Sequence, residues 1–130
     1  GIYTITIYAK DGTGYFRNMT VYVEVSDSLK LKGEGTYSYP NPFKPGTDEL
    51  TLYYDLTESS KTTLFIYDLN GKLVWKRIYT PPEEGAHSNV NKTTWDGKDM
   101  FGNYVANGPY YYFIVADGKV LGRGEMAAYR

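Results

Sequence analysis

The feature that most constrains the fold of this chain is an alternation of apolar and polar residues, interrupted by turn residues about every ten positions. In Leu50–Leu56, for example, leucine or tyrosine alternates with Thr51, Tyr53 and Asp55. Successive residues of a strand point to opposite faces, whereas a helix needs apolar residues at a period of about 3.6. Almost no segment has the helical period. The pattern therefore predicts an all-β, antiparallel domain.

The segments with this strand pattern are, in chain order, 1–10, 19–25, 50–56, 62–69, 72–80, 91–95, 108–116 and 119–129. Hairpin turns are expected at Asn70-Gly71 and Asp117-Gly118, and Asn-Gly tolerates positive φ at both central positions of a tight turn. Ser26–Thr36 is polar and rich in glycine, and is expected as a linker or a crossover. Tyr39–Gly46 contains three prolines, so we expect an edge segment or an ordered loop there.

Composition excludes several classes of function. The chain has no cysteine, so disulfides, thiol nucleophiles and thiolate metal sites are ruled out. Its formal net charge of −1 provides no global field for nucleic acid or an anionic membrane. The longest apolar run, Tyr110–Ala116, is far shorter than the roughly 18–20 residues of a membrane-spanning helix. No nucleic-acid partner and no membrane insertion are expected, and any signal peptide is expected to have lain upstream.

The sequence shows no set of residues that is typical of a catalytic site. The single histidine, His87, lies in a glycine- and serine-containing loop without a second member of a catalytic triad. The acidic pairs that glycosidase chemistry would need all lie in turns without apolar walls: Glu83, Glu84, Asp96 and Asp99. We expect a non-enzymatic domain that needs no cofactor.

One loop carries oxygen ligands at close spacing. Asp96, Asp99 and Asn103 offer the carboxylate and amide oxygens that calcium prefers. The same residue types stabilise turns through their own backbone, and Lys98 adds a repelling charge, so turn chemistry is the favoured interpretation and calcium the weaker one. Trp95, just before this loop, is expected to fill the core between two sheets.

Four segments, in order, resemble a known family. They are Tyr39-Pro40-Asn41-Pro42-Phe43, the run from Leu64 to Val74, the run from Trp95 to Val105, and Gly108-Pro109-Tyr110-Tyr111. The family is the immunoglobulin-like domain of the flagellar hook-capping protein FlgD, with relatives that include type IX secretion sorting domains. The resemblance implies a two-sheet immunoglobulin-like β-sandwich over 37–130. The hairpin 1–25, before the linker 26–36, resembles the last two strands of a bacterial immunoglobulin-like repeat.

Two apolar surfaces are expected to need a partner. The hairpin has one apolar face, and the strand Tyr110–Val115 is apolar on both faces, with Tyr110, Tyr112 and Ile114 facing the core. The other face is covered either by the chain's own hairpin or by another molecule. The predicted interaction residues are Tyr3, Ile5, Ile7, Val21, Val23, Tyr111 and Phe113.

These observations favour an extracellular or cell-surface structural module of a bacterial secreted protein, whose partner is a neighbouring domain or another copy. Its hairpin would connect copies, in the extreme case into a filament. A C-terminal sorting or anchoring domain is the first alternative. A carbohydrate-binding module that uses Tyr104 and Tyr111 against a cell-surface polysaccharide is the second. Asn18-Met19-Thr20 and Asn91-Lys92-Thr93 also match the short and common glycan acceptor pattern.

Overall fold

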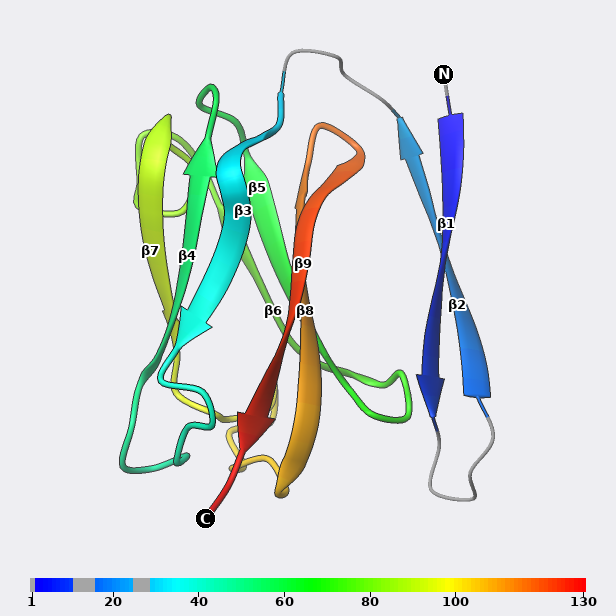
Figure 1. Cartoon of the computed structure of the whole chain (residues 1–130), viewed down its shortest axis with the longest axis vertical. Coiled ribbons are helices and arrows are strands. Elements are labelled where there is room, and N and C mark those ends of the chain that lie inside the picture. The colour runs from blue at the N-terminus through cyan, green and yellow to red at the C-terminus, as the bar shows by residue number, and fades with distance from the viewer. Residues whose placement is uncertain (1, 11–15, 25–28) are drawn as a thin grey trace.

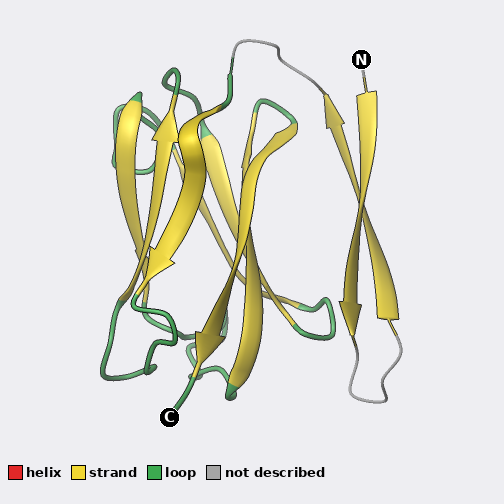
Figure 2. Cartoon of the chain, viewed as in Figure 1, coloured by secondary structure: helices red, strands yellow, loops and turns green. Residues whose placement is uncertain are grey.

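The computed structural model describes residues 2–10, 16–24 and 29–130, with the side chains of residues 29–32 and 35–130. Every regular element in this part of the chain is a strand (Figure 2), which confirms the all-β prediction. The strands are β1 (Ile2–Lys10), β2 (Phe16–Glu24), β3 (Leu31–Tyr39), β4 (Leu50–Leu56), β5 (Thr62–Asp68), β6 (Leu73–Tyr79), β7 (Asn89–Trp95), β8 (Gly108–Ala116) and β9 (Lys119–Ala128). Within these ranges no helix is long and apolar enough to cross a membrane.

The strands form three antiparallel sheets. A three-stranded sheet has the order β3-β4-β7, and a four-stranded sheet has the order β6-β5-β8-β9. These two sheets face each other as a sandwich, while β1 and β2 form a separate hairpin on the side of β9 (Figure 1). The predicted immunoglobulin-like sandwich with an additional N-terminal hairpin is therefore confirmed.

The first strand of the sandwich lies partly where we expected a linker. Strand β3 starts at Leu31, inside the segment Ser26–Thr36, and pairs with β4. The reason is a short alternation that the neighbouring glycines obscure: Leu29 is buried and Leu31 packs against the core, whereas Lys30 is exposed. The expectation of a linker is thus wrong from Leu31 onward.

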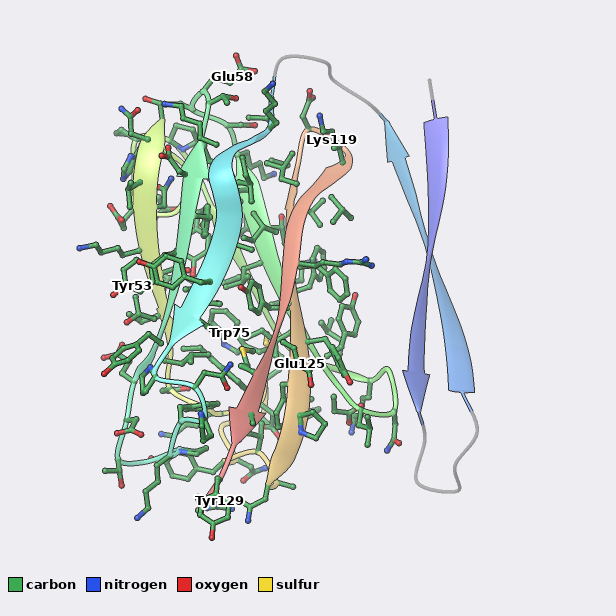
Figure 3. All side chains as sticks on the ribbon, in the orientation of Figure 1. Tyr53, Glu58, Trp75, Lys119, Glu125 and Tyr129 are labelled. Atoms are coloured by element: carbon green, nitrogen blue, oxygen red, sulfur yellow. The ribbon has the colours of Figure 1, made fainter. Side chains whose placement is uncertain are left out.

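The core between the two sheets consists of the inward residues of both. Leu50, Leu52, Leu64 and Ile66 have no exposed surface, and Trp95 is also buried, which confirms its predicted position in the core. The indole ring of Trp95 packs against Phe43, Trp75 and Tyr110, and Figure 3 shows Trp75 in the space between the sheets. Its Nε1–H donates to the backbone carbonyl of Lys98 at 2.9 Å.

The two predicted hairpin turns form by different geometries. Asp117 and Gly118 both have positive φ, as a tight two-residue turn requires. At Asn70-Gly71 only Gly71 has positive φ, so the predicted turn geometry is wrong there although the hairpin is present. The carboxylate of Asp68 explains the difference, because it accepts the backbone N–H groups of Asn70 and Lys72 and holds a longer loop.

The proline-containing segment Tyr39–Gly46 follows one edge of the four-stranded sheet. Phe43 donates its backbone N–H to Ala127 at 2.8 Å and accepts that of Tyr129 at 2.9 Å. The side chain of Asn41 adds hydrogen bonds to the backbone of Glu125 and Ala127. The segment therefore covers the end of β9, which confirms the prediction of an edge segment.

Candidate functional site

The outer face of the four-stranded sheet carries a cluster of aromatic side chains. We call this cluster, Phe65 and Tyr67 on β5 with Tyr111 and Phe113 on β8, the aromatic face. The strand register places Phe65 opposite Phe113 and Tyr67 opposite Tyr111, so the four side chains form two adjacent cross-strand pairs. Such pairs on neighbouring strands stabilise the sheet and also make a continuous apolar surface.

Three of the four rings of the aromatic face contact one another. Tyr67 lies edge-on to Phe113 with ring centroids 5.7 Å apart and stacks on Phe65 at 6.2 Å. Phe113 is only 5% exposed although it points away from the sandwich core, and burial raises the pKa of the Tyr67 and Tyr111 phenols. The prediction that β8 is apolar on both faces is therefore confirmed.

Polar side chains border this face. The ammonium group of Lys76 lies 5.7 Å from the ring centroid of Phe65, a cation–π contact. On the opposite side, Arg123 pairs with Phe113 in the register and Glu125 pairs with Tyr111 (Figure 3). An apolar centre with a charged border is the usual anatomy of a protein interface.

The N-terminal hairpin lies at the edge of the same sheet. Its register places Tyr3 opposite Val23 and Ile5 opposite Val21, so these predicted interaction residues form cross-strand pairs; Ile7 is opposite Met19. Their side chains lie outside the described part of the structure. Strand β2 runs close to β9 without joining its hydrogen-bond ladder (Figure 1).

The loop with the calcium candidates uses its side chains to hold turns. Asp96 Oδ1 accepts the backbone N–H of Lys98 at 2.9 Å. Asp99 Oδ1 accepts the backbone N–H groups of Phe101 and Asn103 at 2.9 and 3.0 Å. Within the described ranges, no group of three or more acidic, histidine or cysteine side chains is arranged to hold a metal ion. The geometry is that of Asx turns, the interpretation that the sequence favoured.

His87 is bound on both ring nitrogens. Nδ1 lies 2.7 Å from the carbonyl oxygen of Ser88, and Nε2 lies 2.7 Å from a carboxylate oxygen of Glu84. Both partners only accept hydrogen bonds, so the doubly protonated imidazolium satisfies both. The Ser88 carbonyl and the Glu84 carboxylate accordingly raise the pKa of His87. The histidine joins two parts of one loop and has no free nitrogen for general-base catalysis.

Two further sequence candidates have other partners in the structure. The side-chain amide of Asn91 is buried and donates to the carbonyl groups of His87 and Asn89, so it is not accessible to a glycan in the folded domain. The ring of Tyr104 lies beneath the cationic groups of Lys98 and Arg130, at 5.1 and 5.8 Å. Tyr111 belongs to the aromatic face. Neither tyrosine proposed for sugar stacking is free of neighbours.

The model of the FlgD Ig-like domain family matches residues 41–119. A search of curated proteins gives no match.

Several solved structures share the fold. PorZ, an essential bacterial surface component of the type-IX secretion system of Porphyromonas gingivalis, is 24% identical over 75% of this chain, with a TM-score of 0.51. Dimeric latent PorU from the same organism is 17% identical over 98% of the chain, with a TM-score of 0.53. AlkC, an alkylpurine DNA glycosylase of Pseudomonas fluorescens, is 15% identical over 79%, with a TM-score of 0.56. The chain spans 12% of PorZ, 12% of PorU and 31% of AlkC, and these similarities show the fold alone.

Proposed function

The chain belongs to the FlgD Ig-like domain family, and we propose that it works as a non-catalytic module that assembles with other copies of itself in a secreted or cell-surface protein. In this proposal, the aromatic face of one copy receives the β1–β2 hairpin of the next. The observation that carries the proposal is the row of apolar side chains on the outside of the four-stranded sheet.

The aromatic face supports a protein partner by its chemistry. The outer faces of antiparallel sheets usually carry polar residues, because they are in contact with water. Here Phe65 and Tyr67 stand beside Tyr111 and Phe113 across two central strands. Aromatic residues are the side chains most enriched at the centres of protein interfaces, where charged side chains are depleted. A protein surface with its own apolar stripe is the matching occupant.

The hairpin is suited to be that occupant. A two-stranded hairpin alone is marginally stable in water, so β1 and β2 gain stability from any surface that covers one of their faces. The sequence places Tyr3, Ile5 and Ile7 on one face of β1, and the register aligns them with valine and methionine on β2. The outer edges of β1 and β2 also offer unpaired backbone groups for strand addition.

The absence of catalysis is part of the proposal and rests on the arrangement of titratable groups. The His87–Glu84 pair is tied to its own loop, and the acidic residues at 96 and 99 hold turns. A surface location draws support from family membership and from the surface role stated for PorZ, which has the same fold. The alternative of a sorting or anchoring domain uses the same fold but needs no self-association.

The test is the mass of the protein in solution, measured by light scattering over a concentration series. We expect the full chain to form higher species and a chain that lacks residues 1–25 to remain a folded monomer. The double variant Phe65→Ser/Tyr111→Ser should also remain monomeric, because it removes apolar area from the receiving face.

A matched control is Tyr37→Ser/Tyr53→Ser, which removes two tyrosines from the outer face of the other sheet and should leave self-association unchanged. A full chain that is monomeric at every concentration contradicts self-assembly and favours the anchoring alternative. Self-association that persists in both the truncated chain and the Phe65/Tyr111 variant places the contact elsewhere on the molecule.

A further inference from the structure

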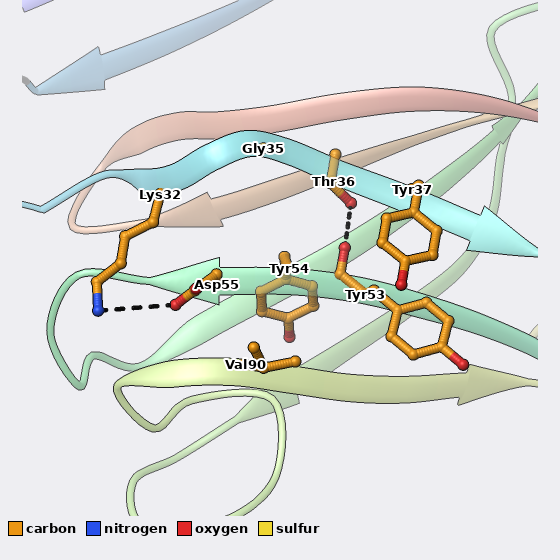
Figure 4. A pocket seen from close by; sticks show the side chains of 8 residues that line it. All are labelled: Lys32, Gly35, Thr36, Tyr37, Tyr53, Tyr54, Asp55 and Val90. Carbon is orange, nitrogen blue, oxygen red and sulfur yellow. Dashed lines mark hydrogen bonds and ion pairs between the residues drawn. The ribbon is translucent and has the colours of Figure 1, made fainter.

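The outer face of the three-stranded sheet contains a groove that the proposed assembly does not use. It has a volume of about 420 Å³ and is lined by side chains and backbone of Lys32, Gly35, Tyr37, Tyr53, Asp55 and Val90 (Figure 4). This volume falls within the range of roughly 300–1,000 Å³ that is typical of small-ligand pockets. We call it the tyrosine groove.

The groove is formed by an irregularity in β3. Leu31 pairs with Leu56 and Thr36 pairs with Tyr54, so four residues of β3, 32–35, stand opposite the single residue Asp55 of β4. The extra residues move β3 away from β4 above Asp55, and Gly35 adopts the positive φ that this path requires. Bulges of this kind are common beside binding sites.

Hydrogen bonds of Thr36 fix the end of the bulge. The hydroxyl of Thr36 donates to the backbone carbonyl of Tyr53 at 2.7 Å and lies 3.1 Å from the hydroxyl of the buried Tyr112. The end of the bulge is thereby attached to the sandwich core. Because these hydrogen bonds hold the groove in place before a ligand arrives, binding costs little conformational entropy of the protein.

Two tyrosine rings form one wall of the groove. Tyr37 and Tyr53 stack with centroids 4.6 Å apart and planes 13° from parallel. Tyr53 also has the ammonium group of Lys92 at 5.8 Å from its ring. Tyr37 is 62% exposed and Tyr39, further along β3, is 68% exposed, and within the described side chains no other ring or cation lies against Tyr37. Tyr37 therefore offers a flat apolar surface with a hydroxyl at its tip.

Asp55 supplies a carboxylate to the lining of the groove. Its Oδ1 atom is buried and accepts no hydrogen bond within the described part of the chain. Lys32 Nζ forms an ion pair with Asp55 Oδ1 at 3.9 Å, which is too long for a hydrogen bond, and donates instead to the side chain of Asn89 at 2.9 Å. The Asp55 side chain as a whole is nevertheless 34% exposed, so a ligand in the groove reaches the carboxylate through its other oxygen, Oδ2.

These features indicate which class of ligand the groove can bind. In the lining, the ammonium group of Lys32 and the carboxylate of Asp55 lie 3.9 Å apart and offset each other, so the groove has no net charge to attract a charged ligand. A sugar ring is neutral, has an apolar C–H face that packs on an aromatic ring, and carries hydroxyl donors around its rim. We infer that the tyrosine groove binds a neutral saccharide, with one sugar ring against Tyr37 and a hydroxyl group donating to Asp55.

The experiment is an NMR titration of the uniformly ¹⁵N-labelled full chain with a panel of neutral hexasaccharides of glucose, xylose, mannose and N-acetylglucosamine. We expect at least one to shift the backbone amide signals of Tyr37, Asp55 and Val90 at millimolar concentration. Asp55→Asn, which keeps the shape of the side chain, and Tyr37→Ala should each weaken binding roughly tenfold or more.

The control variant is Tyr104→Ala, which removes another exposed tyrosine and should bind as the unmodified chain does. The spectrum of each variant reports whether it is folded, and Asp55→Asn keeps the test valid if Tyr37→Ala is not. The inference is overturned if no hexasaccharide shifts these signals, if the shifts lie on the aromatic face, or if a neutral glycine–serine peptide binds the groove and the saccharides do not. Because self-association is measured on the other sheet, failure here leaves the proposed assembly untouched.

Discussion

The two outer faces of the sandwich both carry tyrosines but place them in opposite surroundings. On the four-stranded sheet, Tyr67 contacts the rings of Phe65 and Phe113 and is opposite Tyr111 in the register, and burial raises the pKa of both phenols. On the three-stranded sheet, Tyr37 and Tyr39 are mostly exposed, and Tyr37 lines the same groove as the charged side chains of Lys32 and Asp55. Tyrosine content alone therefore does not identify a binding surface, because the neighbours of each tyrosine decide whether its ring contacts protein or a hydrated ligand.

The largest expected difference between the faces is in stability. Phe113 on the aromatic face is almost fully buried, so Phe113→Ala should lower the free energy of unfolding by about 3–5 kcal/mol. Tyr37→Ala removes only an exposed stacked ring and should cost about 1 kcal/mol. Urea unfolding of both variants at one pH measures the difference. Equal losses of stability would contradict the difference in burial between the two faces.

An intermediate effect is expected at Thr36, which attaches the groove to the core. Thr36→Val removes the hydrogen bond to the Tyr53 carbonyl and leaves the buried hydroxyl of Tyr112 without that partner, so we expect a loss of about 1–3 kcal/mol in the free energy of unfolding. Thr94→Val, at an exposed position of the same sheet, is the matched control and should change stability by less than about 0.5 kcal/mol. A Thr36→Val variant as stable as this control would show that the Thr36 hydroxyl does not hold β3 to the core.

The smallest effect concerns the loop beside the three-stranded sheet, where His87 contacts Glu84. The pKa of His87 is higher in the folded state than its unfolded value of 6.5. The contribution of His87 to stability is therefore complete below pH 6.5 and is lost as the pH rises through the folded-state pKa. The pKa of Glu84 is lowered, against the effect of desolvation, by hydrogen bonds from His87 and the Lys92 backbone. The contribution of Glu84 to stability is therefore present above pH 4.5 and is lost as the pH falls through its lowered folded-state pKa.

The pair should therefore stabilise the fold most between pH 4.5 and 6.5, by no more than about 1 kcal/mol because both side chains are partly exposed. Urea midpoints of the unmodified chain and of His87→Asn, measured across this range, are the check. The difference between them should shrink as the pH rises above the range. A constant difference would show that the His87 contact does not depend on its charge.

Much of the fold was predictable because period-two alternation and turn residues are local signals. They located the strands from Leu50 onward and the core position of Trp95. Strand β3 was missed because Gly33 and Gly35 interrupt its alternation, and only the partner strand β4 reveals Leu31 as a core residue. The turn at Asn70-Gly71 differed because the Asp68 carboxylate, two residues earlier, holds its backbone.

The candidate sites were predictable to different degrees. The alternation of β8 was enough to place Tyr111 and Phe113 on an outer apolar face. The tyrosine groove was not, because it depends on a bulge in a strand that the sequence did not show and on a register that brings Tyr37 beside Tyr53. An unpaired acceptor such as Asp55 Oδ1 is visible only once all of its neighbours are placed.

The assignment of the aromatic face to a protein partner is tested by the rate at which individual tyrosines are nitrated in the full chain, followed by mass spectrometry at low and high protein concentration. We expect Tyr67 and Tyr111 to become protected as the concentration rises, whereas Tyr37 and Tyr39 should react at the same rate throughout. Rates for Tyr67 and Tyr111 that do not depend on concentration, or protection of Tyr37 and Tyr39 in their place, would contradict the assignment of the aromatic face to a protein partner.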